Sequence, residues 1–327
     1  MQDHGRRLQP EDRRDEATDD EFVAPDPVPV GEIDRDSDAE RGSEPELVRL
    51  PSTVAHQPIS GVVAAAVAGI LVLAVGLYAT TRTPTDDTIP MFRATDLIFW
   101  VLGAVAIAVA TIGTQFAELS ARSGAVALGQ ATQGRGTPLA WVLPGCATLA
   151  SVLLIATWHN VPVALIGAIL TVVSVVVALL VRDLFDDLTD SAVRVAVLVH
   201  GVTIHLVAFI GLATLYHNKL PAWLTALLVA VFAGLLIVEA LGRAPLRDVH
   251  RIGMAALGGL VVAQAAVVIE RWPTWGWTGG IALLVTFFVA NGLLVTWAVT
   301  RNVARRDVGY YAGLGAIGLA MIALFAL

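Results

Sequence analysis

Cysteine and lysine are almost missing from this chain, and each scarcity excludes a class of site. The 327 residues include one cysteine, Cys146, so a disulfide within the chain and a cysteine-based metal site are both excluded. The one lysine, Lys219, falls in a polar turn between two apolar runs. Because a retinal Schiff base needs a lysine in the middle of a helix, the sequence also excludes an opsin-like photoreceptor.

Motifs of soluble enzymes are missing as well. The chain has no phosphate-binding Walker loop, no dinucleotide-binding glycine motif, no His-Glu-x-x-His pair and no Gly-x-Ser-x-Gly turn. After Arg82, no polar segment is long enough to form a catalytic domain of its own. These absences favour a protein that is not an enzyme, although they leave membrane-embedded chemistry open.

Charge is scarce and unevenly distributed. Charged residues make up 15% of the chain, against about 25% in an average soluble domain. Residues 1–58 hold 16 acidic residues and seven arginines, whereas the rest of the chain holds 12 acidic and 14 basic residues. With few aromatics and no apolar period, residues 1–58 are expected to form a disordered, acidic cytoplasmic tail. A solvated spacer is the simplest role for this tail, and docking of a protein partner is the alternative.

Long apolar runs are what the chain has in abundance. Nine runs follow residue 58, and each is close to the about 20 residues that cross a hydrocarbon core of about 30 Å. We predict an all-α integral membrane domain over residues 59–327, a bundle of about nine transmembrane helices. Glycine pairs such as Gly309 with Gly313, and Gly253 with Gly258-Gly259, indicate tight helix packing. The expected helices are 60–80, 97–116, 139–157, 162–181, 193–215, 222–241, 252–270, 279–299 and 308–326.

Similar turns recur between the predicted helices. The pairs Arg182-Asp183, Arg247-Asp248 and Arg306-Asp307 close the fourth, sixth and eighth runs, which suggests three similar helical hairpins in the middle of the bundle. Ten Arg residues fall on the side of the membrane that holds these three pairs, against four Arg or Lys on the other side. Since short cytoplasmic loops carry the excess of basic residues, we expect the N-terminus in the cytoplasm and the C-terminus outside. The membrane expected is a bacterial-type plasma membrane.

Aromatic residues gather in the turns predicted on the external side. Trp and Tyr favour the headgroup layer, where a ring is half buried and its polar edge is wet, so anchoring explains most of this pattern. The alternative is an external aromatic ring that binds a glycan or a lipid head. The residues concerned are Trp158, His159, Tyr216, His217, Trp272, Trp275 and Trp277.

Two histidines fall near the middle of the predicted fifth helix. His200 and His205 are five residues apart, about 140° around a helix, so they do not share one face. With Gln264 and Asn291 of later helices they define a candidate polar core, which would serve as a proton relay, a metal site or a polar solute site. The alternative is neutral histidines that bond neighbouring carbonyls and hold helices together. Glu239 is expected near a cytoplasmic helix end, where snorkelling or access to water lowers the cost of its charge.

One loop has the composition of a divalent-cation site. Asp183, Asp186 and Asp190 fall at i, i+3 and i+7, on one helical face, and carboxylates so placed can hold Mg²⁺. The nine residues from Arg182 to Asp190 resemble the first aspartate-rich motif of the membrane-embedded prenyltransferases, which also have nine helices. The resemblance implies Mg²⁺-dependent transfer from a diphosphate. The sequence departs from that family in Arg182, where Asn is usual, and in the second motif, for which only Asp248 is present.

The sequence thus favours a non-catalytic multi-pass membrane protein, either a carrier for a small or amphipathic molecule or a scaffold, with a small polar core. No cofactor and no nucleic-acid partner are expected, and the lipid bilayer is its surroundings. The alternative is a membrane-embedded enzyme that modifies a lipid or isoprenoid with the Asp-rich loop and Mg²⁺.

Overall fold

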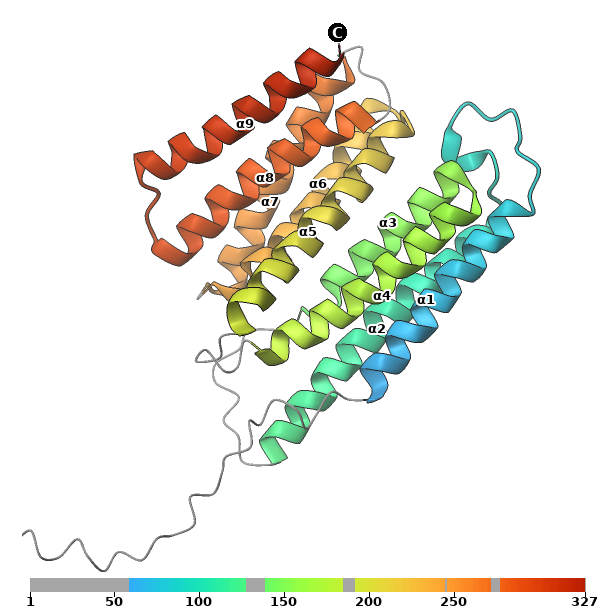
Figure 1. Cartoon of the computed structure of the whole chain (residues 1–327), viewed down its shortest axis with the longest axis horizontal. Helices are drawn as coiled ribbons and strands as arrows, with labels where there is room; N and C mark the ends of the chain where they lie inside the picture. The colour runs from blue at the N-terminus through green and yellow to red at the C-terminus, as the bar shows by residue number, and fades with distance from the viewer. Residues whose placement is uncertain (1–58, 128–138, 185–191, 245, 272–276, 327) are drawn as a thin grey trace, which may run out of the picture. The chain divides into compact units, whose positions relative to one another are not determined.

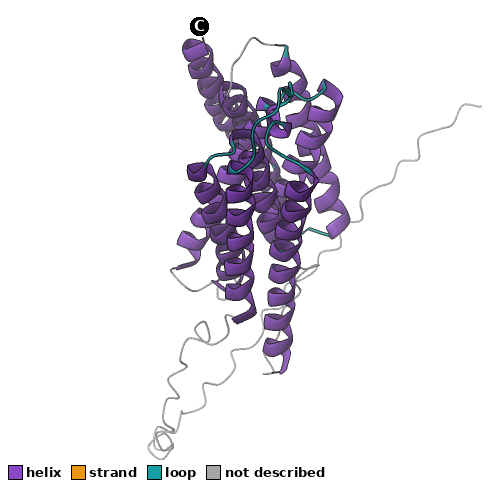
Figure 2. Cartoon of the chain, turned by 90° about the vertical axis from the view of Figure 1, so that its right-hand side faces the viewer, coloured by secondary structure: helices purple, strands orange, loops and turns teal. Residues whose placement is uncertain are grey.

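The computed structural model describes residues 59–127, 139–184, 192–244, 246–271 and 277–326, and these residues form helices joined by connections without any strand (Figures 1 and 2). The predicted tail, residues 1–58, lies outside them. The elements are α1 (Ile59–Thr80), η3 (Pro90–Phe92), α2 (Leu97–Ala127), α3 (Val142–Trp158), α4 (Val161–Leu184), α5 (Ala192–His217), α6 (Ala222–Ala240), η4 (Leu241–Arg243), α7 (Asp248–Glu270), α8 (Trp277–Thr300) and α9 (Arg305–Ala326).

The helices have the length and surface of membrane spans. Seven of those in the described ranges, α1, α2 and α4 to α8, are long and apolar enough to cross a bilayer. Their outward faces carry large apolar side chains such as Leu97, Ile112 and Val268, which are mostly exposed. A soluble protein does not expose so much contiguous apolar surface, whereas lipid covers it without cost. The predicted all-α, multi-pass membrane fold is therefore confirmed, and nine remains an approximate number of spans.

α3 is the exception in length, because it has only 17 residues. Nearly all of it is buried, from Val142 to Thr157, among α1, α2, α4, α5 and α6. α1 to α4 pack against one another, and α5 to α8 form a second set in which α9 packs on α8, as Figure 1 shows. The two sets meet where α5 packs on α3 and α4 and where α6 packs on α3. Because protein surrounds α3 on most sides, its length need not match the hydrocarbon core.

α2 is longer than the apolar run predicted for it. The run ends at residue 116, but the helix continues to Ala127. Glu118 and Arg122 lie one turn apart in this extension, and the Arg122 Nε donates to the Glu118 Oε1 at 2.9 Å. An oppositely charged pair at i and i+4 stabilises a helix, so the helix outlasts its apolar stretch.

Glycines allow a close helix approach between α6 and α7. A Cβ built on Gly259 would lie 2.3 Å from the Ala230 carbonyl oxygen and 3.1 Å from the Gly234 nitrogen. Only glycine lets two backbones come so near. By contrast, Gly253, Gly309 and Gly313 have no neighbouring atom within 4 Å of such a Cβ. The predicted tight packing therefore holds for Gly258 and Gly259, and it is wrong for Gly253 and for the Gly309–Gly313 pair.

Consecutive helices run in opposite directions, so the connections gather at two ends of the bundle (Figure 1). We call one the Arg-rich end: it holds the last turns of α4, α6 and α8 and the first turns of α5, α7 and α9. The other is the aromatic end, where α3, α5 and α7 finish and where α4, α6 and α8 begin.

Candidate functional site

A buried histidine and a buried carboxyl group face each other between α5 and α6 near the Arg-rich end. His200 lies two turns into α5, and Glu239 is the penultimate residue of α6. The His200 Nε2 and the Glu239 Oε1 are 3.6 Å apart, and the two side chains are only 8% and 4% exposed. Apolar residues such as Leu236, Ile237 and Leu241 are fully buried around this end of α6. Glu239 is thus enclosed by protein, and the expectation that it has access to water is wrong.

The pair stands at the junction of three helices. α3 packs on both α5 and α6, and its buried Cys146 belongs to the same apolar core as Leu236 and Leu241. α7 packs on α6, and within α7 the Nη1 of the buried Arg251 lies 3.5 Å from the Asp248 Oδ1. Removing a carboxylate from water costs several kcal/mol, and removing an imidazole also carries a cost, unless each finds a partner. The pairing of His200 with Glu239 meets that condition.

His205 lies about 7.5 Å farther along α5 and faces a different helix. Its ring lies 5.6 Å from that of Phe287 and 5.7 Å from that of Phe288, both on α8, with centroids as reference points. Its Nδ1 is 2.7 Å from the Gly201 carbonyl oxygen, and its buried Nε2 has no hydrogen-bond partner among the described residues. The two histidines therefore point to different neighbours, as their spacing predicts.

The other two residues of the predicted polar core, Asn291 and Gln264, differ in burial. Asn291 is buried on α8, one turn beyond Phe287, and its Oδ1 has no hydrogen-bond partner in the described part of the chain. Gln264 is exposed on α7, in a stripe with Leu260 and Val268. α7 turns this stripe away from the helices it packs on, so Gln264 does not line the buried site. The prediction that Gln264 belongs to the polar core is therefore wrong.

The described residues offer no metal centre. No group of three or more His, Cys, Asp or Glu side chains within them is arranged to hold an ion. Asp183 belongs to the last turn of α4, but its side chain lies outside the described residues. Asp186 and Asp190 lie outside them entirely, so the Mg²⁺ site predicted for this loop stays a prediction.

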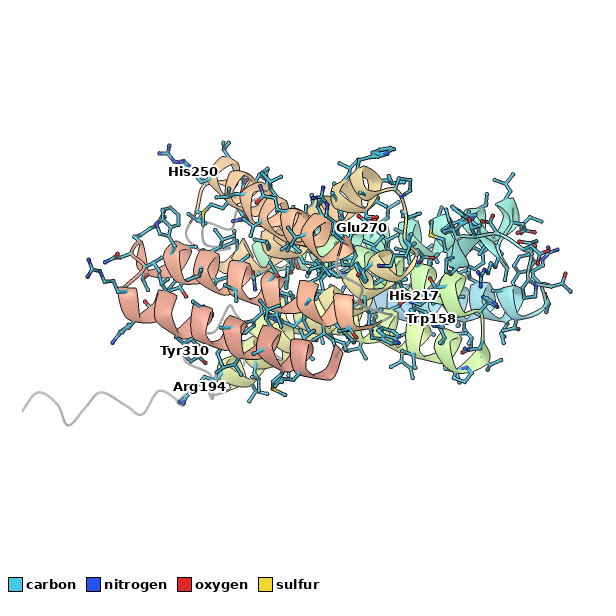
Figure 3. All side chains as sticks on the ribbon, turned by 90° about the horizontal axis from the view of Figure 1, so that it is seen from above. Trp158, Arg194, His217, His250, Glu270 and Tyr310 are labelled. Atoms are coloured by element: carbon cyan, nitrogen blue, oxygen red, sulfur yellow. The ribbon has the colours of Figure 1, made fainter. Side chains whose placement is uncertain are left out.

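At the aromatic end, three of the predicted aromatic residues form one stack. The ring of Trp158 lies 4.8 Å from that of Trp277 with 6° between their planes, and 4.9 Å from that of His217 with 29° between them. Figure 3 shows Trp158 and His217 side by side, where α3 and α5 end. Trp277 is 44% exposed. Trp158 and His217 are the last residues of α3 and α5, and Trp277 is the first of α8, so the stack ties the ends of three helices together.

The remaining predicted aromatic residues do not join this stack. Tyr216 is fully buried, and its hydroxyl donates to the Ile269 carbonyl oxygen at 3.3 Å, so it is a core residue and not part of an external ring. The Lys219 ammonium lies 3.7 Å from the Tyr216 ring centroid. His159 adopts a left-handed backbone conformation and ends α3. Trp272 and Trp275 lie outside the described residues.

Sequence reasoning missed Asn218, which fastens the aromatic end. Its Nδ2 donates to the Thr157 Oγ1 at 2.9 Å and to the Thr214 carbonyl oxygen at 2.8 Å. Its Oδ1 accepts from the Met91 N–H at 2.8 Å. α5, α3 and η3 are thereby joined through one buried amide. The position of Asn218 between His217 and Lys219 suggested an exposed polar turn, so nothing in the sequence indicated that its side chain is buried.

Comparison with known proteins gives a family match. Residues 80–325 match the sequence model of a family described as "Protein of unknown function (DUF5656)". No curated protein and no solved structure matches the chain. The match covers α2 to α9, and so includes both the His200–Glu239 pair and the aromatic stack.

Proposed function

The chain belongs to the DUF5656 family, and for this member we propose a non-catalytic membrane carrier whose transport step is linked to protonation at the His200–Glu239 pair. The observation that supports this is the burial of both ionisable groups between α5 and α6. Ionisable residues inside membrane helices are costly, and they commonly mark proton relays or solute paths. A histidine opposite a carboxylate can accept and release a proton near neutral pH.

A scaffold has less need for such a pair. Replacing a buried ion pair with apolar residues of similar volume is often neutral or stabilising, so structure alone is a weak reason to keep one. Two further polar atoms support a path through this half of the bundle, because the His205 Nε2 and the Asn291 Oδ1 are buried without hydrogen-bond partners among the described residues. A buried unsatisfied group costs about 1–3 kcal/mol, which a polar cargo or a water molecule would offset.

The proposal includes an orientation. The Arg-rich end would face the cytoplasm of a bacterial-type plasma membrane, with the N-terminus inside and the C-terminus outside, because basic residues favour the cytoplasmic side. The His200–Glu239 pair would then lie nearer the cytoplasm, and His205 and Asn291 deeper in the membrane.

The test is proton entry into vesicles that contain the purified protein and a trapped pH-sensitive dye. An imposed pH gradient should collapse faster with the wild type than with His200→Ala. The matched control is His250→Ala, because His250 is exposed near the start of α7 (Figure 3) and should leave the rate unchanged. If the wild type is no faster than protein-free vesicles, or if both variants equal it, the pair is no proton site and a scaffold is favoured.

The same vesicles distinguish a carrier from the alternative, a membrane-embedded enzyme. A lipid-modifying enzyme that uses the Asp-rich loop would lose activity on Asp186→Asn and would require a divalent cation. A carrier centred on His200 should tolerate Asp186→Asn and the removal of divalent cations. A scaffold should tolerate both substitutions and depend on the N-terminal tail or on the aromatic turns.

A further inference from the structure

An apolar groove runs between α7, α8 and α9, apart from the polar residues discussed above. Its volume is about 540 Å³, within the range of about 300–1,000 Å³ typical of ligand pockets. The lining includes Leu257, Val261, Val289, Leu293, Ala312 and Leu319. Thr286 supplies the polar side chain of this lining, and its hydroxyl donates to the Ala282 carbonyl oxygen at 3.0 Å. The groove therefore offers mainly apolar contacts.

Arg305 lies on the same face of α9 as the groove lining, nearer the Arg-rich end. Arg305 precedes Ala312 by seven residues, nearly two whole turns, so the two residues lie on the same face of the helix. Both are exposed, and about 10 Å of helix axis separates them. Helical side chains lean toward the N-terminus of their helix, so Arg305 leans away from the groove toward the membrane surface.

The neighbouring charges keep this end basic. Arg306 pairs with Asp307 at 3.6 Å, and the Arg301 guanidinium lies 5.6 Å from the Trp297 ring centroid. With Arg305, three arginines and one aspartate occupy the turn between α8 and α9 and the first residues of α9. The excess of positive charge adjoins the groove at the depth where the headgroup of a lipid would sit.

We propose that this groove holds one hydrocarbon chain of an anionic membrane lipid, whose phosphate lies beside Arg305. The concave lining contacts a chain on more sides than the flat outer faces of the bundle, so a chain in the groove gains dispersion contacts that bulk lipid lacks. Arg305 adds an attraction that an anionic headgroup can use and a zwitterionic headgroup uses less. The site does not depend on the proposed carrier function, because its lining includes neither His200 nor Glu239.

The test is native mass spectrometry of the purified protein in detergent, with phosphatidylglycerol and phosphatidylcholine of identical chains added in equal amounts. The wild type should retain one phosphatidylglycerol, in roughly fivefold preference to phosphatidylcholine, as one surface arginine allows. Arg305→Gln changes an exposed residue and should abolish the preference while some lipid is still retained.

Variants that fill the groove test whether it holds the hydrocarbon chain of a lipid. Ala312→Phe and Ala316→Phe each place a ring in the groove and should lower retention of both lipids several-fold. The control is Ala256→Phe, which adds the same ring to an exposed position of α7 outside the lining and should retain lipid as the wild type does. Two variants guard against one that fails to fold. Retention unchanged in a folded groove variant, or equal retention of the two lipids by the wild type, would overturn the proposal.

Discussion

The contact between α6 and α7 allows a prediction with a matched control on the same helix. In Gly259→Ala, the new methyl group would lie 2.3 Å from the Ala230 carbonyl oxygen and 3.1–3.2 Å from the Gly234 backbone. An ordinary contact needs about 3.5 Å, so the two helices must separate by about 1 Å. Because backbone atoms cannot rotate away as a side chain can, the cost should fall near the upper end of overpacking, about 3 kcal/mol.

Helix propensity opposes this cost. Alanine stabilises a helix by up to about 1 kcal/mol relative to glycine, so Gly259→Ala should destabilise the protein by about 2 kcal/mol overall. Gly253→Ala meets no atom within 4 Å and should gain that stabilisation without any cost. The two variants should therefore differ by about 3 kcal/mol in the free energy of unfolding.

The measurement is the loss of helicity, followed by circular dichroism, as mild detergent is exchanged for a denaturing one. Gly259→Ala should unfold at a clearly lower fraction of denaturing detergent than Gly253→Ala. Equal midpoints would refute the close α6–α7 approach, since both substitutions add the same atoms to the same helix.

Three further predictions concern other contacts. Asn218→Ala removes three hydrogen bonds and should lower the free energy of unfolding by about 2–3 kcal/mol in the same titration, whereas the exposed Asn302→Ala should not. Trp158→Ala removes two stacked ring pairs and should cost about 1–3 kcal/mol; an unchanged midpoint would mean that the stack is not formed. A double-mutant cycle between His200→Ala and Glu239→Gln should give a coupling of about 1 kcal/mol, and strict additivity would contradict the pairing.

Sequence alone predicts the helices well. A chain in lipid must satisfy its backbone hydrogen bonds within each helix, and each such helix is visible in the sequence as a long apolar run. α1, α4 and α6 begin or end within a few residues of the predicted limits. The end of α2 was placed too early because hydropathy falls at Glu118, whereas the helix persists through the Glu118–Arg122 pair. Apolar length measures the thickness of the membrane and not the length of a helix that extends beyond it.

The rotation of each helix is much harder to predict. α7 is apolar on all sides, so its sequence does not reveal that Gln264 faces outward while Gly258 and Gly259 face α6. Glu239 was correctly placed near a helix end but wrongly given access to water, since one sequence does not show that α5 packs over that turn of α6. His200 and His205 were recognised because they are polar within an apolar run, but their partners depend on contacts between distant segments.

The central claim is that the Glu239 carboxyl, held against His200, exchanges a proton inside the membrane. Infrared difference spectra of the reconstituted protein between low and high pH test it directly, through the band of a protonated carboxyl group. Glu118 is the matched control, a buried carboxylate held by Arg122 one turn away. We expect a titrating band that Glu239→Gln removes and Glu118→Gln leaves in place. No titrating band, or one that survives Glu239→Gln, would contradict it.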